Sequence, residues 1–327
     1  MMDLIPSDVK RIIFAPLNWG LGHATRSIPL IKCLLDHDKE IILASDGEAL
    51  MCLQHQFPSL HYIRLPGYNV SYKGDSLGHI IFSNAWNVYK AIRKEKKMAD
   101  RILEDHDADL IISDSRFGFR SRKAPSIIIS HQLSPLANTA ILQSLIRMGN
   151  HHYLLKFDQI WVPDSPDRKL SGDLSLTNIK NKVRYIGPIS RLKKVMANET
   201  MIDILIILSG PEPARTKLES QILKFARLSP KSIVLVRGTT LLKPINGMKH
   251  LRIINMADGE TISRLLCSSK VVISRSGYTS LMDYDHLGIR AFLIPTPGQS
   301  EQEYLAQYHE NRGHAHIKDL QQLVELF

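Results

Sequence analysis

Residues 271–283 read Val-Val-Ile-Ser-Arg-Ser-Gly-Tyr-Thr-Ser-Leu-Met-Asp, so an apolar run passes through small polar residues and glycine into a helix-like segment. A second unit of the same kind follows, with an apolar run at 291–295 and a polar, helix-like segment at 296–303. Two successive strand–turn–helix units bring two helix N-termini to the carboxyl edge of a parallel sheet, where such sheets bind ligands. Free N–H groups at helix N-termini favour anions, above all phosphate. This part of the chain therefore predicts a parallel α/β sheet with a phosphate site at its edge.

The same alternation of apolar runs and helix-like segments extends outward through both halves of the chain. In the first half, the predicted strands are 11–16, 40–45, 61–65, 110–114, 126–131 and 159–164, and the predicted helices include 24–35 and 80–105. In the second half, the predicted strands before residue 271 are 204–208, 232–236 and 252–254, and the predicted helices there are 214–226 and 258–267. Strands that alternate with helices indicate doubly wound parallel sheets.

The length of 327 residues is enough for two domains of about 150 residues each. We predict an N-terminal Rossmann-like domain at 1–187, a linker at 188–201 and a C-terminal Rossmann-like domain at 202–327. Two similar α/β domains on one linker place the expected ligand site in the cleft between them.

The composition is that of a soluble globular protein, with 44% hydrophobic and 23% charged residues. No apolar run approaches the roughly 18 residues needed to span a bilayer, and no signal peptide is evident at the N-terminus. The three cysteines, Cys33, Cys52 and Cys267, form no CxxC pair, which is typical of reduced thiols in a cytoplasmic protein. The net charge of +10 indicates anionic partners, but no nucleic-acid-binding motif accompanies it.

A glycine-rich loop at 17–23 follows the first predicted strand and ends in His23. Its glycines let the backbone approach a ligand, and a neutral histidine near pH 7 suits general base catalysis. The alternative is that His23 only packs against the helix or caps its start. Asp114 and His131 each end a predicted strand at the same sheet edge, where either would serve as an alternative base, as an acceptor contact or as a loop-stabilising residue.

Four motifs carry a resemblance to a known family: Gly-Leu-Gly-His-Ala-Thr-Arg at 20–26, Ile-Gly-Pro at 186–188, Ser-Arg-Ser-Gly at 274–277, and Pro295 with Gln299 and Gln302. Together they resemble nucleotide-sugar glycosyltransferases of the GT-B fold. The group concerned is the one that contains the lipid-linked N-acetylglucosaminyl transferase of peptidoglycan synthesis. The resemblance implies two Rossmann-like domains that face each other across a cleft. It implies a UDP-sugar on the C-terminal domain and an acceptor on the N-terminal domain.

The resemblance also assigns site residues. It implies that Asp283 binds the ribose hydroxyls, that Gln299 and Gln302 contact the donor sugar, and that Arg215 lies near the pyrophosphate. The remaining implied donor-side residues are Gly210, Met256, Arg275, Ser276, Gly277, Tyr278 and Thr279. The candidate acceptor-side residues are Asn18, Gly20, Gly22 and His131.

The chain departs from the family pattern in two places. The family's glycine-rich turn is here 209–213, where Pro211 and Pro213 lack N–H donors and Glu212 adds negative charge. Asp283 replaces the longer Glu that is usual in the family. Arg275 has two interpretations, because it would either bind phosphate or pair with a nearby Asp283 or Asp285.

These observations predict transfer of a hexosyl group from a UDP-sugar to an acceptor hydroxyl, with His23 as base and Asp114 as the second candidate. The resemblance implies an inverting, metal-independent displacement without a cofactor. The histidines at 151, 152, 314 and 316 have no carboxylate or cysteine at ligand spacing, so we predict no metal site. Two alternatives remain open: a UDP-sugar hydrolase of the same fold, and a catalytically inactive nucleotide-sugar-binding protein.

A basic surface raises the question of a membrane partner. The predicted helix at 80–105 ends in a run of lysines and arginines, and further cations follow at Arg116, Arg120, Arg122 and Lys123. With the apolar residues at 141–146, they would dock on an anionic bilayer, so a cytoplasmic location at the inner membrane face is one expectation. The other is a solvated helix face without a partner.

Overall fold

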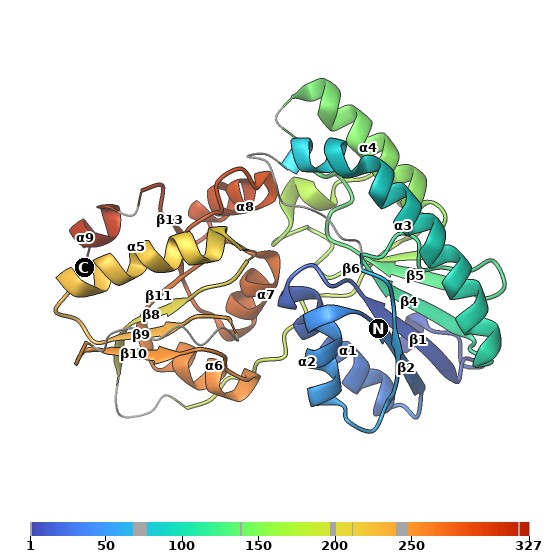
Figure 1. Ribbon diagram of the computed structural model, residues 1–327, viewed down its shortest axis with the longest axis horizontal. Helices are drawn as coiled ribbons and strands as arrows, with labels where there is room; N and C mark the ends of the chain where they lie inside the picture. The colour runs from blue at the N-terminus through green and yellow to red at the C-terminus, as the bar shows by residue number, and fades with distance from the viewer. Residues whose placement is uncertain are drawn as a thin grey trace. The chain divides into compact units, whose positions relative to one another are not determined.

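The computed structural model describes residues 2–67, 77–137, 139–196, 201–210, 212–239, 248–319 and 321–326, with the backbone alone at 77–86 and 324–326. The chain divides into two compact units, Met1–Ile189 and Ser190–Phe327 (Figure 1). Among the described helices, none is long and apolar enough to cross a membrane.

The first unit is built on a parallel sheet. Over the described residues its strands are β1 (Arg11–Pro16), β2 (Glu40–Ser45), β3 (His61–Arg64), β4 (Leu110–Asp114), β5 (Ser126–Ile129), β6 (Gln159–Val162) and β7 (Val183–Tyr185). Their order is β3-β2-β1-β4-β5-β6-β7. The helices are α1 (Leu21–Leu35), α2 (Gly47–Gln56), α3 (Leu77–Asp105) and α4 (Ala140–Leu154), with 3₁₀ turns at Met2–Leu4 and Gly172–Ser175. Figure 1 shows α3 along one side of the sheet and α1 and α2 along the other.

The second unit repeats this plan with a smaller parallel sheet. Its described strands are β8 (Ile202–Ile207), β9 (Ile233–Val236), β10 (Leu251–Ile254), β11 (Ser269–Ser274), β12 (Phe292–Leu293) and β13 (Ala315–His316), in the order β10-β9-β8-β11-β12-β13. Its helices are α5 (Ala214–Leu228), α6 (Gly259–Cys267), α7 (Tyr278–Leu287), α8 (Ser300–Glu310) and α9 (Gln321–Leu326). Asp258 caps α6 as predicted, accepting a hydrogen bond of 2.7 Å from the Thr261 N–H. The predicted class of two doubly wound α/β sheets is confirmed.

The strand order reverses direction once in each sheet. In the first unit β1 lies beside β4, with Pro16 paired to Asp114 at their carboxyl ends. In the second unit β8 lies beside β11, with Ile207 paired to Ser274. Open α/β sheets bind ligands at such switch points. The loops that leave these strand ends are therefore the places to look for a site in each unit.

Apolar residues explain why both sheets form. In the first unit α3 packs Ala99, Ile102 and Leu103 onto a sheet face that includes Ile13 and Ile42. In the second unit α5 packs its apolar side chains onto the sheet. The buried cluster there combines residues of α5 and of the strands: Ile204, Ile206, Leu218, Ile222, Phe225, Ile233 and Ile273. Strands that are buried on both faces read as near-continuous apolar runs, which is why the sequence revealed them.

Three features differ from the sequence-based expectation. Helix α1 begins at Leu21, three residues earlier than predicted, so His23 lies in its first turn. Helix α4 was not predicted, because its apolar side chains do not form a stripe that faces the core. Of its residues, Leu154 is the one that is buried. The start of the segment predicted as a linker packs on the second unit: Leu192 is buried, and the Lys193 N–H donates to Ser263 Oγ at 3.2 Å.

Candidate active site

The loop between β1 and α1 is tied to the start of α2. Asn18 donates from Nδ2 to Asp46 Oδ2 at 3.2 Å, and its Oδ1 accepts from the Ala49 N–H at 3.2 Å. Gly20, which precedes α1, has a φ of +79°, a conformation that favours glycine. Asn18 therefore braces the loop, and Gly20 makes the turn that delivers His23 to the sheet edge. Gly22 lies beside His23 in the first turn of the helix.

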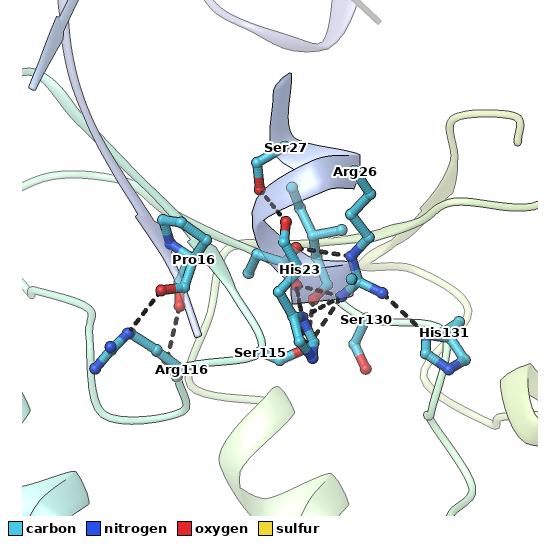
Figure 2. Close-up of polar contacts among 12 residues, drawn as sticks. Pro16, His23, Arg26, Ser27, Ser115, Arg116, Ser130 and His131 are labelled. Carbon is cyan, nitrogen blue, oxygen red and sulfur yellow. Dashed lines mark hydrogen bonds and ion pairs between the residues drawn. The ribbon is translucent and has the colours of Figure 1, made fainter. Parts of the chain in front are cut away.

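His23 faces the carboxylate at the end of the neighbouring strand. Its Nδ1 lies 2.9 Å from Asp114 Oδ1, although the two residues are 91 positions apart in sequence. The pairing of β1 with β4 brings them together, because α1 starts just after β1 and Asp114 is the last residue of β4. Figure 2 shows His23 on the first turn of α1, pointing toward this cluster.

Arg26 joins the pair from the next turn of the same helix. It forms a two-point ion pair with Asp114, donating from Nε to Oδ2 at 2.7 Å and from Nη2 to Oδ1. Its Nη1 lies 3.4 Å from His131 Nδ1, and its Nη2 lies 2.9 Å from His23 Nδ1 (Figure 2). Arg26, Asp114 and His131 are all buried, whereas the His23 side chain keeps 18% of its surface exposed. His23 is thus the member of the cluster that solvent or a substrate can reach.

The neighbours of His23 Nδ1 decide its tautomer. Asp114 only accepts and Arg26 only donates, so their contacts of 2.9 Å with Nδ1 favour opposite tautomers. We assign the Nδ1 proton to the hydrogen bond with Asp114, because a lone pair on Nδ1 would face the negative charge of the carboxylate, and this assignment leaves the lone pair on Nε2. Burial and the positive charge of Arg26 lower the pKa of His23, and the nearby Asp114 only partly opposes this. A neutral imidazole with a free Nε2 is the form that a general base requires.

Asp114 is not suited to the role of base that the sequence allowed for it. Its burial favours the neutral form, but the charge of Arg26 and the hydrogen bonds from Arg26 and His23 outweigh that effect and hold the pKa of this carboxyl far below its usual range. A carboxylate so stabilised does not take up a proton near neutral pH. Its position instead suits it to orient His23. His131 contacts the cluster through Arg26 and is buried.

Arg116 stands apart from the surface cations with which the sequence grouped it. It is fully buried, donates to Pro16 O at 3.0 Å and to Glu95 Oε1 at 2.6 Å, and pairs with Asp46. The expectation that Arg116 belongs to a membrane-facing basic surface is therefore wrong. Arg116 forms ion pairs with two acidic residues inside the unit, and its contacts link the end of β1 to α3 and to the start of α2.

In the second unit, two helix N-termini lie at the ends of β11 and β12, as the opening stretch predicted. Gly277 precedes α7 with an ordinary φ of −75°, and a Cβ built there would meet nothing within 4 Å. The chain's own packing therefore does not require glycine at this position, whereas a closely approaching ligand would. Ser276 Oγ donates to Gln302 O at 2.7 Å, which links the turn before α7 to α8.

The two glutamines expected to contact a donor sugar are linked to each other. Gln302 donates from Nε2 to Gln299 Oε1 at 2.7 Å and accepts from the Thr296 N–H at 2.9 Å. The turn before α7, the loop before α8 and the first turn of α8 thus form one hydrogen-bonded assembly. Tyr278 is buried at the start of α7, and Thr279 follows it half-buried.

Arg275 pairs with neither Asp283 nor Asp285. It is buried, and it donates to the carbonyls of Pro295 at 2.8 Å, Ala214 at 3.2 Å and Ile294 at 3.4 Å. Burial lowers its pKa to about 10, so it remains charged at neutral pH. Among the described residues it has no carboxylate partner, and its Nε makes no hydrogen bond. The guanidinium links the turn before α7 to the loop after β12 and to the start of α5, and it keeps an uncompensated positive charge at the sheet edge.

Arg215, expected near the pyrophosphate, is enclosed by acids. It is buried and pairs with Glu212 at 2.5 Å and with Glu219 at 2.7 Å, and Glu219 also pairs with Arg237. Glu212 further accepts from the Thr216 N–H at 3.2 Å, so the N-terminus of α5 already holds a carboxylate. Gly210 has a φ of +100°, and Pro211 lies outside the described residues.

Asp283 lies on α7, close to the start of the second unit. Its Oδ1 accepts a hydrogen bond of 2.5 Å from Ser190 Oγ. Burial raises its pKa to about 6, and Ser190 and Arg191 oppose that shift. Met256, expected near the base, follows β10 and is 45% exposed.

Comparison with known proteins gives this arrangement a family context. Residues 249–325 match the glycosyltransferase family 28 C-terminal domain. An uncharacterized glycosyltransferase of Methanosarcina acetivorans is 23% identical over 325 residues, covering 91% of this chain and 83% of that protein. The chain is a GT-B glycosyltransferase. The resemblance that the sequence motifs carry is thereby confirmed.

Solved structures show the same fold as this glycosyltransferase. The spinosyn rhamnosyltransferase SpnG complexed with thymidine diphosphate has a TM-score of 0.66 at 16% identity, covering 96% of this chain and 90% of that one. Acinetobacter baumannii MurG has a TM-score of 0.58 at 12% identity, covering 98% of this chain and 90% of that one.

Sequence reasoning about this glycosyltransferase missed one functional group, Arg26. The signal was present, because His23 and Arg26 are three residues apart and residues at that spacing share a helix face. What the sequence did not show is the partner, since Asp114 is 88 positions from Arg26. Among the described residues no group of three or more His, Cys, Asp or Glu side chains is arranged to hold a metal ion.

Proposed function

We propose that this glycosyltransferase moves a hexosyl group from a UDP-sugar to an acceptor hydroxyl, with His23 as the general base. The observation that carries the proposal is the hydrogen bond between His23 Nδ1 and Asp114 Oδ1. It leaves Nε2 with a lone pair at the edge of the sheet, where ligands of α/β proteins bind. Among the described titratable side chains of that cluster, Arg26, Asp114 and His131 are buried, and His23 is the one that is partly exposed.

The donor side of the proposal belongs to the second unit. The N-termini of α7 and α8 offer N–H groups to a diphosphate, and Gly277 leaves room for its approach. Arg275 adds positive charge to the same edge. Asp283 would accept hydrogen bonds from the ribose hydroxyls, and Met256-Ala257 would lie against the base. The thymidine diphosphate in SpnG supports a nucleoside diphosphate in this fold, and the choice of uridine rests on the resemblance.

The proposed reaction is a single displacement. His23 Nε2 removes the proton of the acceptor hydroxyl as its oxygen attacks the anomeric carbon. The bond to the β-phosphate oxygen breaks, and UDP leaves from the opposite face with its electron pair. Attack opposite to the leaving group inverts the anomeric configuration. The helix N-termini and Arg275 would stabilise the charge that develops on the phosphate, so the scheme needs neither a metal ion nor a cofactor.

A panel of nucleotides tests the donor assignment. Thermal melting with UDP-, GDP- and TDP-sugars should show the largest rise with UDP-sugars. Ligand at about 100 times its Kd adds roughly 2.7 kcal/mol to the free energy of unfolding. If no nucleotide sugar raises the melting temperature at millimolar concentration, the donor site is not where we place it. A preference for TDP- or GDP-sugars would overturn the choice of uridine alone.

Assays with the preferred UDP-sugar then separate transfer from hydrolysis. Transfer predicts UDP release that depends on an added acceptor and is lost in His23→Ala. Rapid release of free sugar without acceptor would identify a hydrolase. Binding without turnover, with every acceptor tested, would support an inactive nucleotide-sugar-binding protein. The structural reason to consider that alternative is that Glu212 already occupies the N-terminus of α5.

A surface of the first unit supports a membrane partner. Helix α4 exposes Ile141 (78%), Leu145 (56%) and Met148 (67%), which share one helix face. A basic cluster lies near the end of the same helix: besides burial, the charges of Arg120, Lys96 and Arg122 lower the pKa of Lys156. An apolar stripe beside clustered cations suits the interface of an anionic bilayer. We therefore include peripheral binding to the inner membrane face, with a cytoplasmic location and a lipid-linked acceptor, in the proposal.

A further inference from the structure

The cluster around His23 contains a cation that the proposed reaction does not itself use. Arg26 is buried, yet it holds both oxygens of Asp114 and reaches His131 on the far side. A base that needs only a carboxylate to orient it would be complete without such a group. The role of Arg26 therefore needs a separate explanation.

The geometry shows what Arg26 does to Asp114. Its planar fork engages Oδ1 and Oδ2 together, so the plane of the carboxylate is fixed by the arginine. Ser115 Oγ adds a hydrogen bond to Oδ1 at 3.2 Å. With Asp114 held in this way, Oδ1 lies 2.9 Å from His23 Nδ1, where it can accept the Nδ1 proton in a hydrogen bond.

The charges show a second effect. Arg26 and Asp114 together are neutral, so the carboxylate is not free to stabilise an imidazolium fully. The charged and titratable groups around His23 are Arg26 on its own helix, Asp114 at the end of β4 and His131 after β5. Of these groups only Asp114 favours a protonated His23, and Arg26 opposes it directly.

We propose that Arg26 is the positioning residue of the active site: it fixes Asp114 in one orientation and thereby holds His23 in the tautomer whose Nε2 carries the lone pair. The proposal rests on the proposed function of His23 as general base. Arg26 touches neither substrate in this scheme: it orients His23 through Asp114, and its charge acts on His23 directly, because Nη2 lies 2.9 Å from His23 Nδ1. It also extends the pH range over which the base stays neutral.

Two substitutions separate the orientation from the charge. Arg26→Gln removes both, and Arg26→Lys keeps the charge but loses the planar fork. We expect Arg26→Gln to lower kcat at least about tenfold and to move the acid limb of its pH profile to higher pH. Arg26→Lys should lower kcat while leaving the acid limb close to that of the wild type. The KM for the donor should change little in both variants, since the donor residues lie in the other unit.

Arg116→Gln is the matched control. Arg116 is another buried arginine tied to two carboxylates, but those carboxylates are Glu95 and Asp46 and not the partner of His23. It should lower the melting temperature without moving the acid limb. A merely structural role for Arg26 predicts the same behaviour for Arg26→Gln, and that result would overturn the proposal.

Nitrogen-detected NMR of histidine-labelled protein gives a readout that needs no turnover, with His23→Gln assigning the His23 signals. The wild type should show His23 with its proton on Nδ1, and Arg26→Gln should show a mixture of tautomers and a higher pKa. An unchanged His23 tautomer and pKa in folded Arg26→Gln would contradict the proposal. If the signals change as expected but His23→Ala retains full activity, the positioning by Arg26 stands and the assignment of His23 as base fails.

Discussion

Ser190 Oγ lies 2.5 Å from Asp283 Oδ1, so the first residue of the second unit holds the carboxylate proposed to bind ribose. Burial has raised the pKa of Asp283 to about 6, so this single hydroxyl does not offset the cost of enclosing the charged form. A ribose diol that took over this oxygen would replace the Ser190 hydroxyl. The contact therefore gives Asp283 a resident partner that resembles the proposed ligand.

The first prediction is that Asp283→Asn stabilises the protein while weakening donor binding. The folded pKa of Asp283 is about 6, whereas an ordinary aspartate carboxyl has a pKa of 3.8, so the folded protein loses stability as pH rises from about 4 to 6. Asn carries no charge at any pH. We expect its advantage to grow over that interval and to level off above it at about 3 kcal/mol, because raising a pKa from 3.8 to about 6 costs about 1.4 kcal/mol per pH unit. Thermal melts between pH 4 and pH 8 measure the difference.

The same variant should bind UDP about tenfold more weakly, because hydrogen bonds to a charged acceptor are stronger than those to an amide. Ser190→Ala is the control, since it keeps the carboxylate and should retain UDP affinity. Isothermal titration of both variants decides between the outcomes. Equal UDP affinity in the wild type and in Asp283→Asn would remove Asp283 from the donor site.

The second prediction concerns the partner of His23. Asp114→Asn should lower kcat by about a hundredfold or more, because an amide can donate to Nδ1 and so select the tautomer without a lone pair on Nε2. It also leaves Arg26 buried without its carboxylate, which destabilises a protein by roughly 3–5 kcal/mol. Activity must therefore be measured below the melting transition of the variant. Full activity in folded Asp114→Asn would contradict the pairing.

The sequence was sufficient for the sheets because their strands are buried on both faces and read as apolar runs, as at Leu110–Asp114. It was not sufficient for α4, whose exposed residues Ile141 and Leu145 do not report the position of a core. Nor did the sequence give the order of the strands within either sheet. Which strand adjoins β1 is set by chain crossovers that local patterns do not encode.

The site divides in the same way. His23 was identified because a glycine-rich loop precedes it, and glycines in a loop indicate a tight turn or a close approach of the backbone to a ligand. The partners of Arg215 and Arg275 were not identified, because a cation looks the same in sequence whether it meets phosphate, a carbonyl or an acid. Structure separates them: Arg215 is held by Glu212 and Glu219, and Arg275 by backbone carbonyls.

The third prediction follows from the carboxylate at the start of α5. Glu212 occupies the Arg215 guanidinium and the Thr216 N–H, both of which would otherwise attract phosphate. Glu212→Gln removes a half-exposed negative charge from that edge, so UDP should bind severalfold more tightly at low salt. The gain should shrink as salt is added, because exposed charges are screened. Weaker UDP binding in this variant would show instead that Glu212 holds Arg215 in place for the donor.

The fourth prediction tests the membrane surface on α4. Leu145→Asp with Met148→Asp should abolish cosedimentation with vesicles that contain an anionic lipid, because two charges would enter the apolar interface. The matched control is Leu228→Asp on α5, which alters a side chain that is 72% exposed in the other unit. It should leave vesicle binding unchanged. Salt should weaken binding of the wild type, since each cation near the surface contributes about 1 kcal/mol.

Neutral vesicles complete this test, because the apolar stripe alone would bind them as well as anionic ones. We expect binding to require both the stripe and the cations, so Arg122→Gln with Lys156→Gln should reduce affinity for anionic vesicles while leaving Ile141, Leu145 and Met148 in place. Equal binding to neutral and anionic vesicles would exclude the basic cluster from the interface. An effect of Leu228→Asp as large as that of the α4 variant would exclude α4 as the specific contact.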